Sequence, residues 1–141
     1  IYKNTSSSEF ITFFIVAWEP AKELLHYINA GHNPPLLTDK NGNIITLDST
    51  GLILGVLPNQ NYERKTITLE EGSVLVIYTD GLEEAMNPEN EMFGQERIIE
   101  VLLECKNGSS KEILKTIQDR AIEFCQGKPL HDDLTMRVVK R

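Results

Sequence analysis

The first two thirds of the chain is made of short apolar stretches with the residue types of β-strands. Residues 10–18 (FITFFIVAW) are β-branched and aromatic, and Glu19-Pro20 closes the stretch. Residues 24–30 (LLHYINA) follow after a short turn. The two stretches therefore predict a β-hairpin.

Two further extended segments, residues 34–39 (PPLLTD) and 40–47 (KNGNIITL), follow directly. Asn41-Gly42 predicts a tight turn, because both residues tolerate the left-handed backbone that such turns require. Residues 51–57 (GLILGVL) form another apolar segment of this strand-like part, in which two glycines allow close backbone approach or unusual dihedrals.

The strand pattern changes character before it ends. Residues 62–72 (YERKTITLEEG) alternate between apolar and polar positions up to a turn at Glu71-Gly72, whereas residues 73–79 (SVLVIYT) are apolar on both faces. A strand with no polar face must be covered on both sides. We therefore expect residues 73–79 to lie in the middle of the fold.

The last third predicts two helices and a closing strand. Residues 94–105 (GQERIIEVLLEC) repeat apolar residues at helical spacing. Residues 109–127 (SSKEILKTIQDRAIEFCQG) begin with a capping box, Ser109 with Glu112 three positions later. Residues 134–140 (LTMRVVK) alternate as a strand. The chain as a whole, residues 1–141, is predicted to be one α+β domain.

Composition narrows the class of partner and compartment. The net charge is −7, from 21 acidic and 14 basic residues, and no basic stripe suits nucleic acid. Cys105 and Cys125 lie in predicted helices and are interpreted as core residues, with a disulfide or metal role as the alternative. This cysteine usage predicts a cytoplasmic location. No apolar run approaches the roughly 20 residues of a membrane span, and the absence of an initiating Met suggests a piece of a longer protein.

Acidic residues stand at the ends of two predicted strands. Asp80 follows residues 73–79, and Asp132-Asp133 precede the last strand. Carboxylates that converge at one point repel each other unless a cation lies between them, and oxygen ligands suit Mg²⁺ or Mn²⁺. Gly81 would let the backbone turn aside and leave Asp80 exposed. The alternative is that Asp80 is an ordinary turn residue and the acidic pair a strand flank.

Other hydrolytic chemistries have no support in the sequence. No Gly-x-Ser-x-Gly elbow accompanies the serines, and no glycine-rich phosphate loop is present. A phospho-acceptor aspartate of the haloacid-dehalogenase type needs a second aspartate two positions later, where this chain has Leu82. Asp80 is therefore not interpreted as a nucleophile.

Four segments together resemble one family. In order and approximate spacing, they are similar to the SpoIIE/RsbU branch of the PPM-type metal-dependent protein serine/threonine phosphatases. The segments are YINAGHNPPLL, GLILGV, LVIYTDGLEEAMNPENEMFGQERI and HDDLTMRVVKR. The resemblance implies a four-layer α/β/β/α sandwich, which agrees with the order of predicted strands and helices.

The same resemblance implies a reaction and a set of site residues. Family members hydrolyse phosphoserine or phosphothreonine on proteins with a water activated by two Mn²⁺ or Mg²⁺ ions. Their metal-binding aspartates fall on Asp80, in Thr79-Asp80-Gly81, and on Asp132. The supporting positions implied by the family motifs are Gly81, Asp133, Glu84 and His32, with Thr135 as the structural end of the last motif and Gly31 beside His32.

The resemblance lacks its first part. Family domains begin with a Gly-Asp strand motif that supplies a bridging metal ligand, and nothing before Phe10 matches it. We therefore expect a PPM domain truncated at its N-terminus, inactive as this chain alone and prone to self-association through uncovered apolar surface.

Two functions follow from these expectations. The first is the C-terminal part of a phosphatase whose substrate, by family analogy, is a phosphorylated anti-anti-sigma protein of the STAS type. The second is a non-catalytic binding module of a partner-switching pathway.

Overall fold

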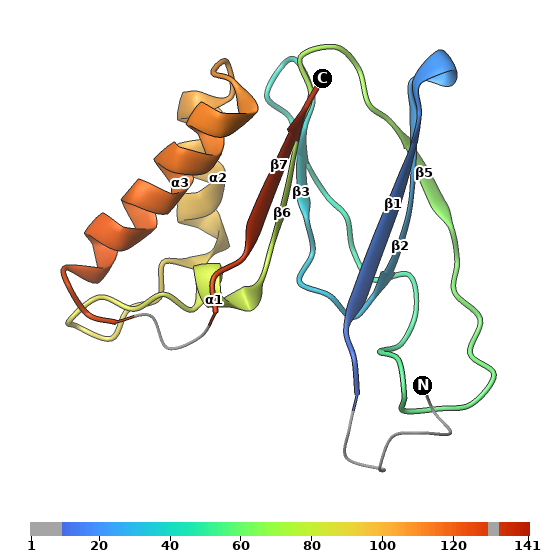
Figure 1. The fold of residues 1–141 in the computed structure, drawn as a ribbon, viewed down its shortest axis with the longest axis horizontal. Coiled ribbons are helices and arrows are strands. Elements are labelled where there is room, and N and C mark those ends of the chain that lie inside the picture. The colour runs from blue at the N-terminus through green and yellow to red at the C-terminus, as the bar shows by residue number, and fades with distance from the viewer. Residues whose placement is uncertain (1–9, 130–132) are drawn as a thin grey trace. The chain divides into compact units, whose positions relative to one another are not determined.

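A computed structural model describes residues 10–129 and 133–141 of the chain (Figure 1). In chain order its elements are β1 (Phe13–Glu19), the 3-10 turn η2 (Pro20–Lys22), β2 (Leu24–Ala30), β3 (Leu36–Thr38), β4 (Ile44–Thr46), β5 (Lys65–Thr68), β6 (Val74–Tyr78), α1 (Asp80–Glu83), α2 (Gly94–Cys105), α3 (Ser110–Cys125) and β7 (Met136–Lys140). Strands and helices occur in the order that the sequence predicts. Among the described residues, no helix has the length and apolar character that a membrane crossing needs.

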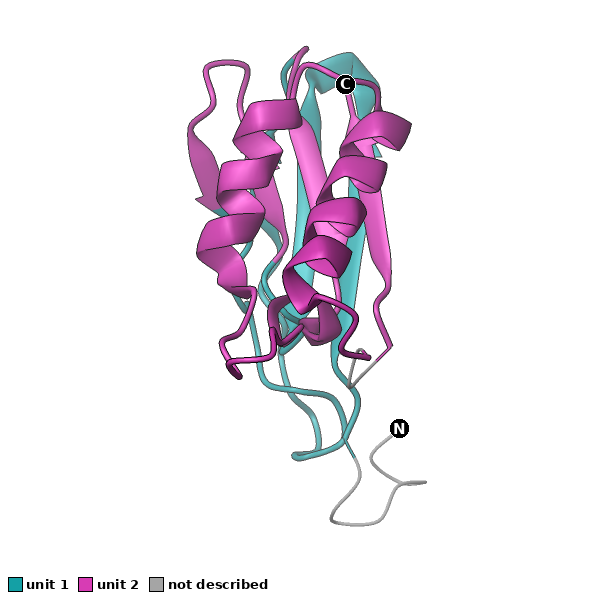
Figure 2. Ribbon diagram, turned by 90° about the vertical axis from the view of Figure 1, so that its left-hand side faces the viewer, with its two compact units in different colours: residues 1–34, 46–70 teal, residues 35–45, 71–141 magenta. Residues whose placement is uncertain are grey.

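The chain divides into two compact units, which Figure 2 shows in different colours. Unit 1 comprises residues 1–34 and 46–70, and unit 2 comprises residues 35–45 and 71–141. Unit 1 contains a three-stranded sheet in the order β1-β2-β5, and a four-stranded sheet has the order β4-β3-β6-β7. The candidate carboxylate Asp80 belongs to unit 2.

The predicted hairpin of unit 1 is confirmed. β1 and β2 pair antiparallel over their full lengths, from Phe13 opposite Ala30 to Glu19 opposite Leu24. The connection is η2, followed by Glu23 in the left-handed region at φ 59°. Pro20 suits the first position of such a turn because its φ is already fixed near the helical value.

The apolar segment 51–57 differs from the strand-like runs around it, because it forms an irregular loop. Among the described residues, its pairing consists of one bridge, in which Leu54 exchanges two backbone hydrogen bonds of 2.9 Å with Ile11. The preceding Thr50 N–H donates to the Asn29 carbonyl at 2.8 Å. Gly55 has φ +101°, which a strand does not accommodate. A Cβ on Gly51 would lie 2.6 Å from Tyr62 Cδ1, so the two glycines provide the close approach and the unusual dihedral that the sequence indicated.

β6 lies between β3 and β7 in the four-stranded sheet, as its lack of a polar face predicts. Val74, Leu75 and Val76 are at most 1% exposed, although they alternate between the two faces of the strand. β3 and β4 are joined by the predicted turn, where Asp39 Oδ1 accepts hydrogen bonds from the backbone N–H groups of Asn41 and Asn43, both at 2.8 Å. The strand that precedes Asp80 is thus paired with a neighbouring strand on each side.

Helices α2 and α3 lie side by side on one face of this sheet (Figure 1). Buried apolar side chains from the sheet and from both helices form one cluster there. The cluster contains Leu36, Val74, Val76, Tyr78, Leu82, Ala85, Phe93, Ile98, Val101, Leu102, Ile113, Ile117, Ala121 and Cys125. Burying each large side chain contributes about 1.5–3 kcal/mol, so this cluster stabilises unit 2 and fixes the base of the site.

The turn between α2 and α3 is tied to the end of β7. Lys140 Nζ donates to the carbonyl oxygens of Lys106 at 2.9 Å and Gly108 at 2.7 Å. These carbonyls follow the last turn of α2, where backbone acceptors have no helical partner and a cation is favourable. The helix layer and the sheet are therefore joined by hydrogen bonds as well as by apolar packing.

The two cysteines of the helices are free thiols, and Cys125 is buried in the apolar cluster. Burial raises the pKa of both thiols above the usual value. Neither is placed in a disulfide, so their interpretation as core residues is favoured over the alternative.

The capping box at the start of α3 is present as predicted, and it provides a stability test. The Ser109 hydroxyl accepts from the Glu112 N–H at 3.3 Å, while the Ser109 N–H donates to Glu112 Oε2 at 2.7 Å. Ser109→Ala should lower the free energy of unfolding by about 1 kcal/mol in urea denaturation. Ser110→Ala, one residue later, is the matched control and should change it much less.

The effect of Ser109→Ala should also depend on pH. Hydrogen bonds from Ser109 lower the pKa of Glu112 from 4.5, so the ionised carboxylate stabilises the folded state. That contribution is present above the unfolded pKa and disappears as the pH falls through the folded one. The difference between wild type and variant should therefore shrink in acid; an equal difference at pH 7 and pH 3 would contradict this account.

Candidate functional site

The candidate site begins where β6 becomes α1. Thr79 is the N-cap residue, with an extended backbone at φ −82° and ψ 159°, and Asp80 is the first residue of the short helix. Gly81 is buried within α1 and is absent from the described glycines with positive φ. The chain therefore turns aside at this point by entering a helix, which leaves Asp80 at the end of the strand.

Asp80 is exposed at this junction, as predicted. Its Oδ1 accepts from the Gly81 N–H at 3.1 Å, and its backbone carbonyl accepts from the Glu84 N–H at 2.9 Å. Among the described residues, none donates a hydrogen bond to Oδ2. A carboxylate at the first position of a helix is also favoured by the helix dipole. Asp80 therefore presents an ionisable oxygen donor to solvent from a rigid base.

The helix that carries Asp80 is held from below by Tyr78. The Tyr78 hydroxyl donates to Glu83 Oε1 at 2.8 Å, and Tyr78 itself is 1% exposed. Burial, opposed by a hydrogen bond from Gln95 and helped by Glu83, raises the Tyr78 pKa well above its usual value. The phenol therefore stays protonated and continues to donate this hydrogen bond.

Thr79 joins the end of β6 to the segment that precedes β7. Its Oγ1 donates to the Asp133 carbonyl at 2.9 Å and accepts from the Thr135 N–H at 3.0 Å. The Thr79 N–H donates to the Thr135 carbonyl at 3.0 Å. Asp133 and Thr135 thus lie beside the residue that precedes Asp80, as expected if the two acidic motifs converge. Asp132 lies outside the described residues.

The chemistry of the donor set fits a divalent cation in type. Asp80 and Asp133 are exposed aspartates in neighbouring segments, and hard oxygen donors are what Mg²⁺ and Mn²⁺ prefer. Within residues 10–129 and 133–141, however, no group of three or more histidine, cysteine or acidic side chains is arranged to hold a metal. The part of the chain that the structure describes therefore brings two candidate carboxylates into neighbouring segments and no third potential ligand beside them.

His32, the remaining candidate, lies in unit 1, in the loop after β2. Its N–H donates to Asn29 Oδ1 at 2.8 Å, and its carbonyl accepts from Asn29 Nδ2 at 3.1 Å. The imidazole lies 6.1 Å from the ring of Phe14 between centroids. These contacts fix the loop backbone, and the supporting role of His32 stays a prediction.

Asn29, near the end of β2, holds this loop and was not singled out by the sequence. It is fully buried, and its Nδ2 also donates to the Leu47 carbonyl at 3.0 Å. A buried amide must have its hydrogen bonds satisfied, so Asn29 organises the three segments around it. Nothing in the sequence distinguishes it from other asparagines except its place two residues before Gly31.

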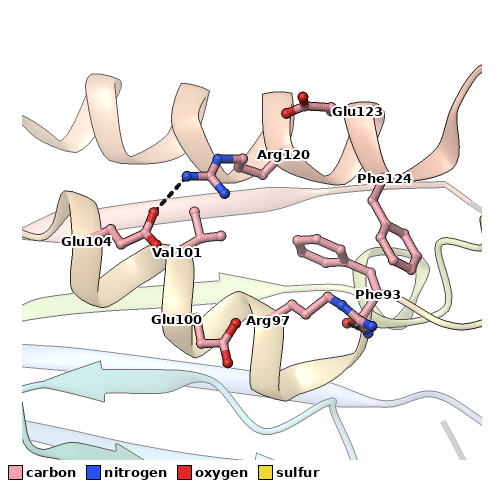
Figure 3. A pocket seen from close by; sticks show the side chains of 8 residues that line it. All are labelled: Phe93, Arg97, Glu100, Val101, Glu104, Arg120, Glu123 and Phe124. Carbon is pink, nitrogen blue, oxygen red and sulfur yellow. Dashed lines mark hydrogen bonds and ion pairs between the residues drawn. The ribbon is translucent and has the colours of Figure 1, made fainter.

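A groove of about 350 Å³ lies between α2 and α3 and contains none of the predicted site residues (Figure 3). Arg97 lies over the ring of Phe124 at 4.7 Å and donates to the Phe93 carbonyl. Arg120 of α3 reaches Glu104 of α2 at 2.7 Å. These contacts join the two helices. The groove is lined by both acidic and basic side chains.

The fold is similar to that of solved phosphatase domains. The chain superposes on the SiaA-PP2C domain of Pseudomonas aeruginosa with a TM-score of 0.83 at 17% identity, covering 99% of this chain and 56% of that one. The fold is therefore that of the PP2C, or PPM, phosphatase domain, and the described residues form part of such a domain. The predicted fold class is confirmed.

Sequence comparison gives the family. The profile of Stage II sporulation protein E (SpoIIE) matches residues 1–141, and the chain belongs to the SpoIIE family. Protein IcfG of Synechocystis sp. is 36% identical over 133 residues, 94% of this chain and 21% of IcfG. Phosphoserine phosphatase RsbU of Bacillus subtilis is 30% identical over 142 aligned positions, 100% of this chain and 42% of RsbU. The chain thus spans less than half the length of either relative.

Gly31 provides a test of the loop beside His32. Gly31 has φ +75°, and a Cβ there would collide with Ile53 Cγ2. Gly94 has nearly the same φ, +74°, but a Cβ there would have no atom within 4 Å. Gly94→Ala should therefore cost only the backbone strain of about 1–2 kcal/mol, whereas Gly31→Ala should cost a further 1–3 kcal/mol or so from overpacking.

The two alanine variants should be compared by urea denaturation. The same loss of stability in both would show that the contact with Ile53 relaxes freely, and would contradict a rigid loop at residues 31–32.

Proposed function

We propose that this chain forms part of a metal-dependent protein serine/threonine phosphatase, in which Asp80 and Asp132 are metal ligands. The observation that carries the proposal is the exposed carboxylate of Asp80 at the end of a buried strand, in a chain of the SpoIIE family. Asp133 supports it, because its backbone is joined to the residue before Asp80. Gly81, Glu84 and His32 are the supporting positions.

Mn²⁺ or Mg²⁺ is the proposed cofactor, with two ions in the complete site. Among structures with this fold, RsbX was solved in complex with magnesium and a SpoIIE phosphatase domain was presoaked with Mn. Such ions lower the pKa of water and neutralise charge on a phosphoryl group. The proposed role of this chain is to hold oxygen ligands, and β6 and α1 fix the position of Asp80.

The proposed substrate is a phosphoserine or phosphothreonine on a regulatory protein, an anti-anti-sigma protein of the STAS type by family analogy. RsbU, a relative over the full length of this chain, is a phosphoserine phosphatase. A cytoplasmic location is part of the proposal, in keeping with two free thiols.

A non-catalytic binding module is the second candidate. The observation in its favour is that the described residues bring no three potential ligands together. In this case the protein would act by contact with a signalling partner, and Mn²⁺ would neither bind tightly nor change its behaviour.

Substitution of Asp80 in the natural full-length protein separates the two candidates. Asp80→Asn keeps the shape of the side chain but removes the charge that a metal ligand needs. Loss of a residue that hydrogen-bonds to a metal ligand typically lowers metal affinity or activity about 10–100-fold. Loss of a ligand itself should cost more, so we expect Mn²⁺-dependent hydrolysis of p-nitrophenyl phosphate and of a phosphoserine protein to fall more than about 100-fold. The folded state should survive, since the carboxylate is exposed.

The matched control is Asp119→Asn, the same change at an exposed carboxylate of α3 that pairs with Lys115. It should leave activity unchanged. Hydrolysis by the 141-residue chain alone should be undetectable for want of ligands. Wild-type full-length protein without Mn²⁺-dependent hydrolysis would favour the binding module.

One face of the unit 1 hairpin supports the expected self-association of the isolated chain. Ile15 and Ile28 are directly opposite on β1 and β2, and Ile15 is 49% exposed. With Ala17 they line an apolar hollow of about 170 Å³. A contiguous apolar surface of this kind favours association over exposure to water.

Replacing both isoleucines should weaken this association. Ile15→Thr with Ile28→Thr keeps β-branched side chains but removes apolar surface, and should lower the mass of the 141-residue chain in light scattering at high concentration. Ile122→Thr, at a 53% exposed position on α3, is the control and should leave the mass unchanged. A monomeric wild-type chain would contradict the expectation.

A further inference from the structure

The pairing of β6 with β7 continues past the point where the strands end. Its last strand pair joins Tyr78 to Met136. One residue further, the Thr79 N–H still donates to the Thr135 carbonyl at 3.0 Å. Residues Asp80–Glu83 form α1, so the chain does not continue as a strand beside β7.

At this point the Thr79 side chain takes over the pairing. Its hydroxyl accepts from the Thr135 N–H at 3.0 Å and donates to the Asp133 carbonyl at 2.9 Å. The alternative acceptor, the Thr135 carbonyl, is 3.5 Å away, so the hydroxyl proton points to Asp133. Since a hydroxyl has a single proton to donate, the bond to Asp133 has a defined direction.

These two bonds connect the acidic motifs through a short path. Thr79 is bonded covalently to Asp80, and Asp133 directly follows Asp132 in the sequence. The two motifs are more than fifty residues apart along the chain, with the Thr79–Asp133 separation being 54. The side chains of Asp133 and Thr135 are exposed, so apolar packing provides little restraint there.

We propose that the Thr79 hydroxyl is a positioning group of the metal site: it holds the segment at Asp133 in register with Asp80 so that carboxylates from both motifs meet one cation. The inference rests on the proposed phosphatase function and adds a residue to it. Metal ligands must be held to within about 0.5 Å, and hydrogen bonds around the ligands supply much of that restraint. Thr79 does not itself need to touch the metal or the substrate.

The test compares three forms of the natural full-length protein. Thr79→Val removes the hydroxyl but keeps the volume and the β-branch, and Thr79→Ser keeps the hydroxyl. Mn²⁺ affinity is measured by isothermal titration calorimetry, with circular dichroism and urea denaturation of the metal-free protein as checks of folding. We expect Thr79→Val to weaken Mn²⁺ binding about 10-fold or more, and Thr79→Ser to stay within about threefold of wild type.

A second readout separates positioning from general damage. Because the lesion is in metal affinity, a high Mn²⁺ concentration should restore much of the hydrolysis of p-nitrophenyl phosphate by Thr79→Val, whereas it should not restore Asp80→Asn. If Thr79→Val does not fold, Thr79→Ala, which cannot overpack, replaces it in the same comparison.

The outcomes distinguish the inference from the function on which it rests. Wild-type Mn²⁺ affinity in Thr79→Val, or an equal loss in Thr79→Ser, would overturn the positioning role while leaving the phosphatase proposal intact. Failure of both Thr79→Val and Thr79→Ala to fold would make the hydroxyl a folding requirement and would also overturn it. Absence of Mn²⁺ binding by the wild type would overturn the proposed function, and this inference with it.

Discussion

The structure of unit 2 depends on the boundary between buried and exposed residues where β6 ends and α1 begins. Val74 and Val76 must be buried, whereas Asp80 must remain in contact with water or with a cation. Moving a carboxylate from water into an apolar interior without a partner costs far more than one apolar side chain contributes. The strand therefore has to end before Asp80, and it does so at Tyr78, so the position of Asp80 at the edge of the sheet follows from the burial of the residues before it.

The rest of the unit serves this boundary in two ways. The apolar cluster beneath α2 and α3 holds β6 from one face, and Tyr78 fixes the first turn of α1 through Glu83. A carboxylate carried on a strand end and a helix start has few ways to move, which is what the proposed metal site requires. Apolar packing under β6 and the Tyr78–Glu83 hydrogen bond in α1 therefore place an exposed carboxylate accurately without burying it.

The sequence predicted the elements whose signal is local. The β1–β2 hairpin, the turn at Asn41-Gly42 and the capping box at Ser109 each follow from residues close together in the chain. The apolar segment 51–57 was harder, because apolar content does not reveal that its backbone bridges to Ile11 at Leu54 and is otherwise irregular within the described part of the chain. Its fold depends on Ile11 and Asn29, which are distant in sequence.

The candidate site was predictable to a similar degree. Exposure of Asp80 follows from its place after a buried strand, but the short helix that begins at Asp80 was not predicted. The hydrogen bonds of Thr79 and of the buried Asn29 join segments tens of residues apart. No pattern of hydrophobic and polar positions encodes such contacts, so they become visible only in three dimensions.

The attachment of β7 at both ends has a consequence for how the chain finds its register during folding. A slip of this strand by two residues would keep Met136 and Val138 on the apolar face, so burial alone does not forbid it. It would, however, separate Lys140 from the carbonyls of the α2–α3 turn at one end and the Asp133 segment from Thr79 at the other. Polar contacts at the two ends of this five-residue strand thus select the native register. They disfavour a two-residue slip that would bury the same apolar surface but move Asp133 away from Thr79.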